Sequence, residues 1–507
     1  MRVCLVCEGC YPYVVGGVSD WVDQLIRAFP DIEFIVLAIR ADRRNSGVFA
    51  YNLPENLTEV HEVYLQDSDW GVDRRNRMHY SLREKDVQAL RSLILNQNAD
   101  WDTVFDIFQR ETVSVDGILM GPDFLKITAE YYDREYPEIV FSDFLWTLRS
   151  IYLPLFLVLK SEIPRADLYH CVATGYAGIL GAMAQKKYHC GLLVSEHGIY
   201  TREREEELIR AKWVQGLYKD IWIGQFRKMS RLAYDRADLV TSLYAHAREL
   251  QIELGCPPEK IRITPNGVDP ARFADIPGKQ PEDEGRINVG AVLRVTEIKD
   301  VKTMIRAFGF ALRRVPGLRL WIMGPLNEEP EYARSCIAMA RQMKLSIGRL
   351  RQDQQSVTVD PSDADVIFTD KVDVTKYMGR MDFTILTSIS EGQPLTILES
   401  FAARKPVIAT DVGDCRGLIY GEKDDFGEAG IVTHIMNTDE IAGAIADMAA
   451  HPDRCRKMGE NGYRRMMSRY RFSDMCDRYA DIYRSFCRRQ NIPWPEEERA
   501  DREGGNG

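Results

Sequence analysis

Residues Val3-Cys4-Leu5-Val6-Cys7 form an almost uninterrupted apolar run, and Gly16-Gly17 follow it after a short loop. Such a run suits a parallel strand that is buried on both faces. Beyond the glycines, apolar residues recur with a 3.6-residue period, which predicts an amphipathic helix. These residues are Val18, Trp21, Val22, Leu25, Ile26 and Phe29. Residues 32–39 supply the next strand, so the order predicts a βαβ unit and a parallel sheet.

Apolar runs of strand length continue to alternate with helical patterns in the first half of the chain. The further strands are predicted at residues 167–171, 192–195, 239–243 and 261–264. They predict one N-terminal doubly wound domain over residues 1–274. Between about residues 70 and 143 the periodicity weakens and charged and aromatic residues mix, so we expect an insertion of helices and loops there.

A second series of strands and helices follows residues 275–286, a segment rich in Pro, Gly and charge that we interpret as an interdomain linker. Strands are predicted at residues 287–293, 318–323, 366–369, 383–387 and 406–410, and helices at 302–313, 332–344, 395–403 and 438–450. This series predicts a second domain over residues 287–470. We expect residues 471–490 to form a helix that packs back on the N-terminal domain, and residues 491–507 to be a disordered tail.

The composition fits a large globular protein. Of the 507 residues, 45% are hydrophobic and 28% are charged, so the chain can bury sizeable cores. Acidic residues outnumber basic ones by 76 to 66, and the net charge is -10. With this balance the protein has no overall positive charge that would favour the binding of nucleic acid.

The N-terminus and the cysteines bear on location. An acid, Glu8, follows only a few apolar residues, and this run is too short for a signal-peptide core. The longest apolar stretch, residues 151–159, is far shorter than the roughly 20 residues that span a bilayer.

The 11 cysteines are odd in number, so a full disulfide framework is impossible and a reducing cytosol is the expected setting. Cys4, Cys7 and Cys10 have the spacing of an iron–sulfur run, but Val14 stands where the fourth ligand would fall. Buried strand thiols are the favoured interpretation.

The strongest constellation is Ser388-Ile389-Ser390-Glu391-Gly392-Gln393-Pro394-Leu395-Thr396-Ile397-Leu398-Glu399, in which a strand ends, a turn follows and a helix begins. Eight residues are slightly more than two helical turns, so we expect Glu391 and Glu399 on one side, about 12 Å apart. That spacing suits a nucleotide sugar. Glu399 would accept hydrogen bonds from a ribose diol and Glu391 from sugar hydroxyls, while free N–H groups at the helix start face a diphosphate. Taken alone, the pair is more simply explained as a helix-start acid and a solvated acid, so the functional interpretation depends on its context.

Arg294 and Lys299 follow the predicted strand at residues 287–293, at the carboxyl edge where open α/β sheets bind ligands. A guanidinium and an ammonium can neutralise a departing nucleoside diphosphate in place of a metal. Considered singly, each residue is more simply explained as a solvated loop charge, and it is their joint position that favours a diphosphate site.

In the N-terminal half, Gly16-Gly17 and His197 also come at strand ends. The glycines would let a ligand approach closely, although a simple tight turn is the alternative. They lack the full dinucleotide fingerprint, so a nicotinamide cofactor is not expected. His197 follows the strand at residues 192–195 and could bond a sugar hydroxyl, or it could be a structural histidine. His170 ends another strand, and we expect it in a pocket wall.

Other catalytic motifs are missing from the sequence. We find no nucleophile elbow of a hydrolase, no Walker lysine loop and no Cys–Cys zinc pair. Asp67-Ser68-Asp69 and Asp363-Ala364-Asp365 match a short diacid pattern of metal-dependent sugar transferases, but chance produces such triplets among 76 acids. We interpret both as surface acids and expect no metal.

Taken together, these motifs resemble the retaining glycosyltransferases of family GT4. The matching motifs, in order, are Gly16-Gly17-Val18, Pro265-Asn266-Gly267-Val268-Asp269, Arg294 with Lys299, and Glu391 to Glu399 followed by Lys405-Pro406-Val407-Ile408-Ala409-Thr410-Asp411-Val412-Gly413. The resemblance covers about residues 1–488. It implies a GT-B fold, an α/β architecture of two Rossmann-like domains that face each other across a cleft.

A narrower resemblance is to the cytosolic transferases of bacterial Pel exopolysaccharide synthesis. It rests on the long N-terminal insertion, on residues 167–175 and on the run Ser195-Glu196-His197-Gly198-Ile199-Tyr200-Thr201-Arg202-Glu203-Arg204. It implies a UDP-sugar donor, a growing polysaccharide as acceptor, and partners in an inner-membrane synthesis complex, with the protein itself in the cytoplasm.

The resemblance also implies roles for individual residues. Catalytic roles fall on His197, Arg294, Lys299 and Glu391, and donor binding falls on Gly17, Arg294, Lys299, Glu391, Gly392, Gln393, Pro394, Leu395, Thr396 and Glu399. Transfer would retain the anomeric configuration, without a protein nucleophile or a metal cofactor. Pro394 departs from the family's usual glycine and removes one N–H from the anion-facing set. Two alternatives are a catalytically silent nucleotide-sugar-binding assembly subunit and a GT-B UDP-sugar epimerase.

Overall fold

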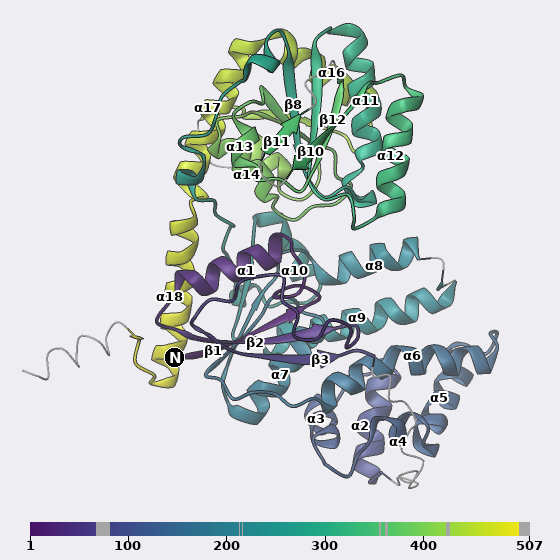
Figure 1. Ribbon diagram of the computed structural model, residues 1–507. Helices are drawn as coiled ribbons and strands as arrows, with labels where there is room; N and C mark the ends of the chain where they lie inside the picture. Colours follow the sequence, from purple (N-terminus) through teal and green to yellow (C-terminus); the bar gives the residue numbers. More distant parts are fainter. Residues whose placement is uncertain are drawn as a thin grey trace, which may run out of the picture. The chain divides into compact units, whose positions relative to one another are not determined.

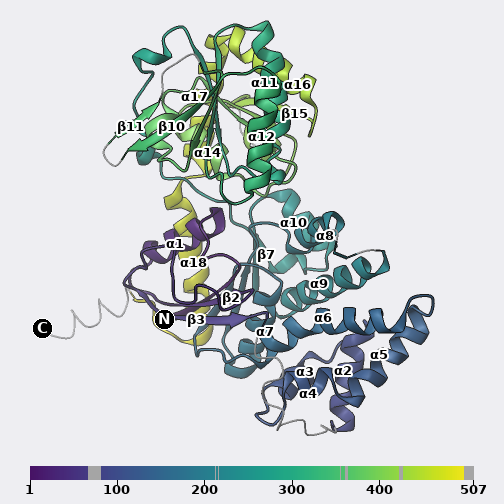
Figure 2. The same ribbon diagram turned by 45° about the vertical axis from the view of Figure 1, so that its right-hand side comes forward.

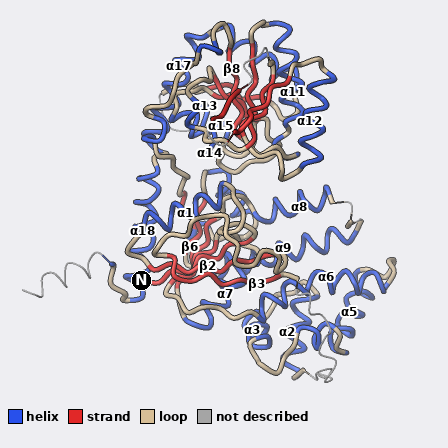
Figure 3. The backbone as a smooth tube through the Cα atoms, viewed as in Figure 1, coloured by secondary structure: helices blue, strands red, loops and turns tan. Residues whose placement is uncertain are grey.

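A computed structural model describes residues 1–66, 82–211, 213–214, 216–353, 356–359, 364–421 and 426–495. The chain forms two compact units, each with its own sheet covered by helices (Figures 1 and 3). Unit 1 consists of Met1–Ile263 and Tyr479–Gly507, and unit 2 of Thr264–Arg478. The predicted α/β fold of two doubly wound domains is confirmed.

The sheet of unit 1 has seven parallel strands in the order β3-β2-β1-β4-β5-β6-β7. The strands are β1 (Arg2–Glu8), β2 (Glu33–Arg40), β3 (Leu57–Tyr64), β4 (Leu168–Cys171), β5 (Gly191–Ser195), β6 (Leu239–Ser242) and β7 (Ile261–Ile263). The five central residues of β1 are buried, because helices cover both faces of the sheet. Cys4 and Cys7 are fully buried in this strand, as the sequence predicted.

The helices of unit 1 fall into those that flank the sheet and those of the insertion. The flanking helices are α1 (Gly17–Ala28), α7 (Tyr176–Tyr188), α8 (Tyr200–Arg210), α9 (Leu217–Arg236) and α10 (Ala245–Glu253), with a 3₁₀ turn η1 (Pro258–Lys260). The insertion holds α2 (Glu84–Ile94), α3 (Trp101–Phe108), α4 (Val115–Leu119), α5 (Pro122–Glu135) and α6 (Phe141–Lys160). Helices α2 to α5 gather around α6 (Figures 1 and 2).

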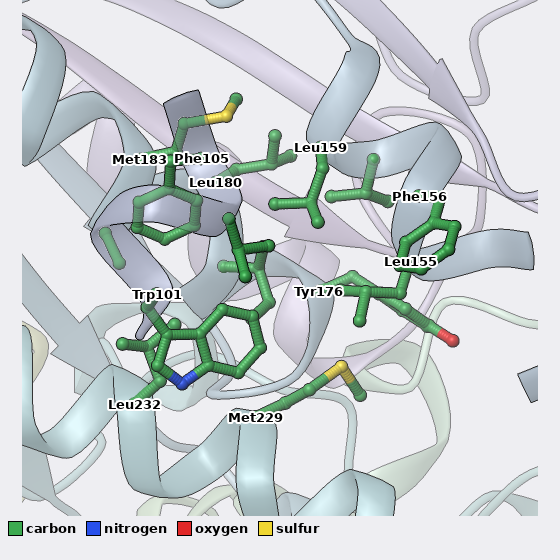
Figure 4. Packing of buried hydrophobic residues seen from close by; sticks show 14 of the residues in the cluster. Trp101, Phe105, Leu155, Phe156, Leu159, Tyr176, Leu180, Met183, Met229 and Leu232 are labelled. Carbon is green, nitrogen blue, oxygen red and sulfur yellow. The ribbon is translucent and has the colours of Figure 1, made fainter. Parts of the chain in front are cut away.

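The insertion shares the hydrophobic core of unit 1. Trp101 and Phe105 of α3 and Phe156 of α6 pack with Met183 of α7 and Met229 of α9 (Figure 4). Burial of such large apolar side chains is the main stabilising term in folding. The insertion is therefore part of unit 1 and not an appended domain.

Helix α6 is longer than the apolar stretch that the sequence suggested. Its 20 residues have a mean hydropathy of 1.3, so by length and composition it could cross a membrane. Its apolar residues Phe144, Leu148, Leu155 and Phe156 are nevertheless buried in the core of unit 1. This packing is that of a core helix.

The sheet of unit 2 has eight strands in the order β11-β10-β12-β9-β8-β13-β14-β15. They are β8 (Ile287–Val292), β9 (Leu318–Met323), β10 (Ile347–Asp353), β11 (Ser356–Val359), β12 (Val366–Asp370), β13 (Phe383–Leu386), β14 (Val407–Thr410) and β15 (Gly430–Thr433). All neighbours are parallel except β10 and β11, which are antiparallel at one edge.

The helices of unit 2 follow the strands in the alternation that the sequence predicted. They are α11 (Val301–Arg314), α12 (Pro330–Gln342), α13 (Thr375–Met378), α14 (Leu395–Ala402), α15 (Cys415–Tyr420), α16 (Thr438–Ala450) and α17 (Pro452–Arg469), with 3₁₀ turns η2 (Pro270–Phe273), η3 (Pro281–Asp283) and η4 (Glu297–Lys299). Val301, Met304, Ile305 and Phe308 of α11 are buried in a hydrophobic core of this unit.

The boundary between the units lies earlier than the sequence suggested. Residues 264–274 belong to unit 2, where Val268 and Phe273 enter a hydrophobic cluster. Residues 275–286, interpreted above as a linker, also belong to unit 2. In this segment Asp283 is buried, and its carboxylate pairs with Arg380 at 2.8 Å. A buried ion pair holds this polar segment against unit 2, which composition alone did not reveal.

The chain returns to unit 1 within helix α18 (Phe472–Gln490). Tyr483 of α18 and Ser195 of β5 lie 2.9 and 2.8 Å from the two ring nitrogens of His170. Tyr479 stacks on the same ring, at 5.8 Å between centroids. These buried contacts attach the second part of α18 to the sheet of unit 1. The expected tail, residues 491–507, lies mostly outside the described residues.

Candidate active site

The candidate site of unit 2 lies where the strand order reverses. Strand β8 is flanked by β9 on one side and by β13 on the other, so successive connections leave it in opposite directions. In open α/β sheets, ligands bind outside the carboxyl ends of the strands at such a switch point. Residues 294–299 follow β8 and residues 387–394 follow β13. The topology thus brings together the two segments that the sequence singled out.

Hydrogen bonds to backbone carbonyls join these two segments. The N–H of Ile389 donates to the carbonyl of Ile298 at 2.8 Å. The hydroxyl of Thr387 donates to the carbonyls of Lys299 and Asp300, both at 3.1 Å. Because each segment supports the other, the side chains of the site rest on a preformed framework.

Lys299 and Glu391 form an ion pair within this framework. Lys299 Nζ lies 2.5 Å from Glu391 Oε1, and the two side chains are only 17% and 11% exposed. Lys299 ends the 3₁₀ turn η4, and Asp300, with φ of 43°, caps α11 by accepting a hydrogen bond from Thr303 N at 3.3 Å. The pair is more shielded from solvent than most ion pairs of the chain, so its charges interact strongly.

Arg294 lies at the same sheet edge but is more exposed. Its Nη1 donates to Glu328 Oε2 at 2.9 Å, and the two side chains are 47% and 33% exposed. Glu328 belongs to the loop after β9, and its neighbour Glu329 accepts a hydrogen bond from the backbone N–H of Glu297 at 2.8 Å. The sequence did not point to Glu328 or Glu329, since neither stands in a motif.

Glu391 lies in the turn before α14, and only Glu399 is part of that helix. The predicted placement of both carboxylates along one helix is therefore not what the structure shows. The physical reason is Pro394, the N-cap of α14, which has no N–H to donate and disfavours a helical conformation in the residue before it. The turn is held by Gly413, whose φ is +54° and where a Cβ would lie 2.2 Å from the carbonyl oxygen of Gly392.

Gln393 binds protein groups on both sides of its amide. Its Oε1 accepts from the N–H of Asn266 at 2.8 Å, and its Nε2 donates to Asp414 Oδ2 at 2.7 Å. The side chain is buried, so its place is inside the turn. Leu395 and Thr396 begin α14, and their N–H groups belong to the first helical turn, which has no earlier carbonyls to bind.

Glu399 lies one turn into α14, with a side chain that is 19% exposed. Its Oε1 is 3.6 Å from Arg272 Nη1 of η2. Arg272 is a third cation of unit 2 beside these acids, and the sequence did not suggest it, because it is far from Glu399 in the chain.

Several buried polar atoms near the two segments have no hydrogen-bond partner in the described part of the chain. They are Thr296 Oγ1, Asp300 Oδ2, Ser388 Oγ and Asn266 Oδ1. Buried polar atoms are normally paired, and each exception calls for an explanation such as a ligand or a water. No sequence pattern distinguished these four residues.

In unit 1, Gly16 and Gly17 stand at the start of α1. A Cβ added at either position would meet no atom of the described residues within 4 Å, and neither residue has a φ in the left-handed region that favours glycine. The fold alone therefore does not require glycine there. This removes the main argument for a simple structural turn.

His197 follows β5, and burial lowers the pKa of its ring to about 4. The ring packs on Trp21, with 4.3 Å between centroids, and its Nε2 has no hydrogen-bond partner among the described residues. A neutral ring with a free nitrogen can exchange a hydrogen bond with a ligand. His170, expected in a pocket wall, is instead fully buried against α18, because its hydrogen-bond partners come from distant elements.

The structure describes only part of the two diacid motifs. Asp67-Ser68-Asp69 and Asp363 lie outside the described residues. Asp365 Oδ2 accepts hydrogen bonds from Ser346 N and Oγ at 2.8 and 2.9 Å. In the part of the chain that the structure describes, no three His, Cys, Asp or Glu side chains are grouped to hold a metal ion.

Comparison with known families defines the class of the protein. Residues 286–451 match the family of group 1 glycosyl transferases, so the protein is a glycosyltransferase. Residues 1–259, more than half of the chain, match the family described as domain of unknown function DUF3492. The chain belongs to that family.

Individual relatives agree with this class. The chain is 20% identical over 327 residues to an MMP α-(1→4)-mannosyltransferase of Mycolicibacterium hassiacum, covering 62% of this chain and 70% of the relative. It is 22% identical over 331 residues to the α-maltose-1-phosphate synthase of Mycolicibacterium smegmatis, covering 61% and 77%.

Solved structures confirm the fold. Anabaena HepE in complex with UDP and glucose superposes with a TM-score of 0.58 at 15% identity, covering 96% of this chain and 100% of that one. A sucrose-phosphate synthase of Thermosynechococcus elongatus has the same TM-score at 14% identity, covering 96% and 98%. The fold of this chain is GT-B.

Proposed function

We propose that this protein is a retaining glycosyltransferase that moves a sugar from a UDP-sugar to a growing exopolysaccharide chain. The observation that carries the proposal is the pairing of Lys299 with Glu391 at the switch point of the unit 2 sheet, beside Arg294 and the start of α14. Two cations and two free helix N–H groups suit a diphosphate, and a carboxylate suits sugar hydroxyls.

Residues of unit 2 would hold the donor. Arg294 and Lys299 bind the diphosphate, and the N–H groups of Leu395 and Thr396 add to its hydrogen bonds. Glu399 accepts hydrogen bonds from the ribose diol. UDP is the favoured nucleotide, a choice supported by the resemblance described above and by the UDP named for Anabaena HepE.

The chemistry follows from charge development on the donor. As the anomeric C–O bond breaks, negative charge grows on the leaving diphosphate and positive charge on the sugar ring. Cations that are already in position stabilise the negative charge on the diphosphate without any rearrangement of the site. The Glu391 carboxylate can bind the sugar. The acceptor hydroxyl attacks from the same face, and the leaving phosphate takes its proton, so no protein nucleophile is needed. Such a site needs no metal.

The roles of unit 1 are proposed on local evidence. His197, neutral and with an unpartnered Nε2, would exchange a hydrogen bond with a sugar hydroxyl. Gly17 would leave room for a phosphate, because no atom of the described residues lies within 4 Å of the place where its Cβ would be.

The acceptor is proposed from the resemblance of the chain to PelF, the cytosolic transferase of Pel exopolysaccharide synthesis. A cytoplasmic location, with contact to partner proteins at the inner membrane, belongs to the same proposal. The eleven free cysteines agree with a reducing compartment.

The first test is a thermal-shift screen of nucleotides and nucleotide sugars. A ligand at 100 times its Kd adds about 2.7 kcal/mol of stability, so UDP and UDP-sugars should raise the melting temperature more than other nucleotides. Turnover is then measured as release of free UDP, and the anomeric configuration of the product by NMR. UDP binding without release would support a silent binding subunit, and an epimeric UDP-sugar formed without acceptor would support an epimerase.

A further inference from the structure

Unit 1 contains a cavity of about 540 Å³ beside the carboxyl ends of β1 and β2. The loops that follow these two strands form its walls. The side chains that line it include Tyr13, Val14, Arg40, Asn45, Val48 and Phe49. A volume of this size, at this edge of a parallel sheet, is typical of a small-molecule site. All of its described lining residues belong to unit 1.

The walls of the cavity are held in place by one carboxylate. Glu62 of β3 accepts hydrogen bonds from Tyr13 and Tyr64, from Arg40 Nη1 at 2.8 Å and from Ser46 Oγ at 2.5 Å. Burial alone would raise the pKa of Glu62, but these hydrogen bonds prevail and lower it to about 2. Because the donors come from both loops and from two strands, the ionised carboxylate fixes the shape of the cavity before any ligand binds.

Further contacts tie the second loop to its surroundings. The N–H of Ala50 donates to the carbonyl of Pro12 at 2.9 Å, and Tyr51 OH donates to Asp20 Oδ1 of α1 at 2.6 Å. The loop is thus anchored at its far end as well. A preformed site loses less entropy on binding than one that must be ordered by its ligand.

The lining combines aromatic and aliphatic surface with a few polar groups. The rings of Tyr13 and Phe49 lie 5.4 Å apart at an angle of 56°, and Phe49, Val14 and Val48 are 37%, 49% and 66% exposed. Arg40 stacks over Tyr13 at 4.0 Å. The apolar C–H face of a pyranose ring packs on such a surface, while its hydroxyls need polar partners such as the side-chain amide of Asn45.

The charge of the cavity favours a neutral ligand. Among the described residues that line the cavity, Arg40 is the cation, and it is already paired with Glu62. These lining residues therefore offer a nucleotide or another anion no uncompensated positive charge. A neutral sugar needs none.

The cavity is offset from His197 along the sheet edge. In the order β2-β1-β4-β5, β5, which ends just before His197, is two strands from β1 and three from β2. At about 4.8 Å per strand this is a lateral distance of roughly 10 to 14 Å. That distance exceeds the width of one pyranose ring, so a sugar in the cavity would not be the sugar that contacts His197.

We infer that the cavity is a distal acceptor subsite, which binds a neutral pyranose unit of the growing chain away from its reacting end. The inference rests on the proposed function and adds to it a source of chain-length preference. An acceptor long enough to reach the cavity gains the contacts with Tyr13 and Phe49, and a shorter one does not.

The test measures binding of defined oligosaccharides without donor, by calorimetry. The probes are N-acetylchito- and cello-oligosaccharides of two to six units. For the wild type we expect affinity to increase with length in at least one series. Phe49→Ala should lower the affinity for the longest probe at least tenfold and remove the dependence on length. Asn45→Gly, which tolerates the left-handed φ of 55° at that position, should weaken binding as well.

The matched control is Leu125→Ala on α5, which removes a similarly exposed apolar side chain outside the cavity, since Leu125 is 44% and Phe49 37% exposed. It should bind the probes like the wild type. Wild-type affinity in Phe49→Ala, an equal loss in Leu125→Ala, or failure of both probe series to bind the wild type would overturn the inference.

A parallel titration with UDP separates this inference from the proposed function. If the wild type binds UDP but Phe49→Ala binds the oligosaccharides unchanged, only the subsite is refuted. If the wild type binds the oligosaccharides in a Phe49-dependent manner but does not bind UDP, the subsite stands and the UDP-sugar proposal fails.

Discussion

Lys299 Nζ lies 2.5 Å from Glu391 Oε1, and this contact joins the loop after β8 to the loop after β13. Arg294, the other cation of the site, is paired with Glu328 at 2.9 Å. Both cations proposed to bind the diphosphate thus contact carboxylates of unit 2. A diphosphate that reaches either cation must replace or share that carboxylate.

Removing either cation should strongly reduce turnover. In Arg294→Ala or Lys299→Ala, the charge that develops on the leaving diphosphate loses a partner, at a cost of a few kcal/mol, and we expect UDP release to slow by about 10²–10³-fold. Arg294→Lys should also reduce turnover, because the compact ammonium group of lysine does not replace the planar guanidinium group of arginine. Steady-state rates within threefold of the wild type would contradict the assignment.

Glu328→Gln should tighten the binding of UDP. The variant removes the negative charge that competes for Arg294, and an exposed ion pair is worth at most about 1 kcal/mol, so the Kd should fall by up to about fivefold. Calorimetric titration with UDP measures this. The control is Glu331→Gln on α12, an exposed acid near Arg334, which should leave the Kd unchanged. If Arg294→Ala weakens UDP binding but Glu328→Gln has no effect, Glu328 does not compete with the donor.

The two glutamates of the turn and helix should have separable effects. Glu399→Ala removes the proposed ribose acceptor and should weaken UDP and UDP-sugar alike. Glu391→Ala frees Lys299 for the diphosphate, so affinity for free UDP should not fall, whereas turnover and sugar discrimination should. Comparison of UDP affinity with rates of UDP release checks this division, and an equal loss of UDP affinity in both variants argues against it.

His197 should make stability depend on pH. Its folded-state pKa of about 4 lies below the ordinary value of 6.5, so the unfolded chain takes up the proton first as the pH falls. Its contribution is therefore complete above pH 6.5 and is lost toward pH 4, at up to about 1.4 kcal/mol per pH unit. Urea unfolding at pH 7, 6 and 5 should show a shallower pH dependence for His197→Gln than for the wild type. Identical slopes would show that the ring is not held neutral.

Activity should survive removal of divalent metals. Two cations and the first N–H groups of α14 can stabilise the leaving group without Mg²⁺ or Mn²⁺. In a metal-dependent site the ion would be the largest local charge, and its removal would cost several kcal/mol of transition-state stabilisation. The assay uses donor and acceptor in excess EDTA, followed by addition of metal. If EDTA removes nearly all activity and added metal restores it, the cation-based site is refuted. The two diacid motifs would then again be candidate metal ligands.

Much of the fold could be predicted because its signals are local. The apolar run of β1 and the 3.6-residue period of α1 depend only on neighbouring residues, and both elements lie where the sequence placed them. Strand β3 escaped prediction because it is an edge strand, in which Thr58, Glu59, His61 and Glu62 interrupt the apolar pattern.

The candidate site was predictable in part. Arg294, Lys299, Glu391 and Glu399 were found because they follow predicted strands at one sheet edge or share a helix-start motif. The start of α14 at Leu395 was predicted correctly, but the helical spacing wrongly placed Glu391 along the helix, because Pro394 at the N-cap separates Glu391 from it.

The sequence by itself determined the succession of strands and helices, because side-chain periodicity and proline or glycine positions act through the local backbone. Only the tertiary structure decided which charges meet. Lys299 and Glu391 are 92 residues apart, and Arg294 and Glu328 are 34 residues apart. The order of the strands in the sheet brings each pair together, and the same order places the cavity of Tyr13 and Phe49 away from His197. Such contacts depend on how whole elements pack, which no local pattern encodes.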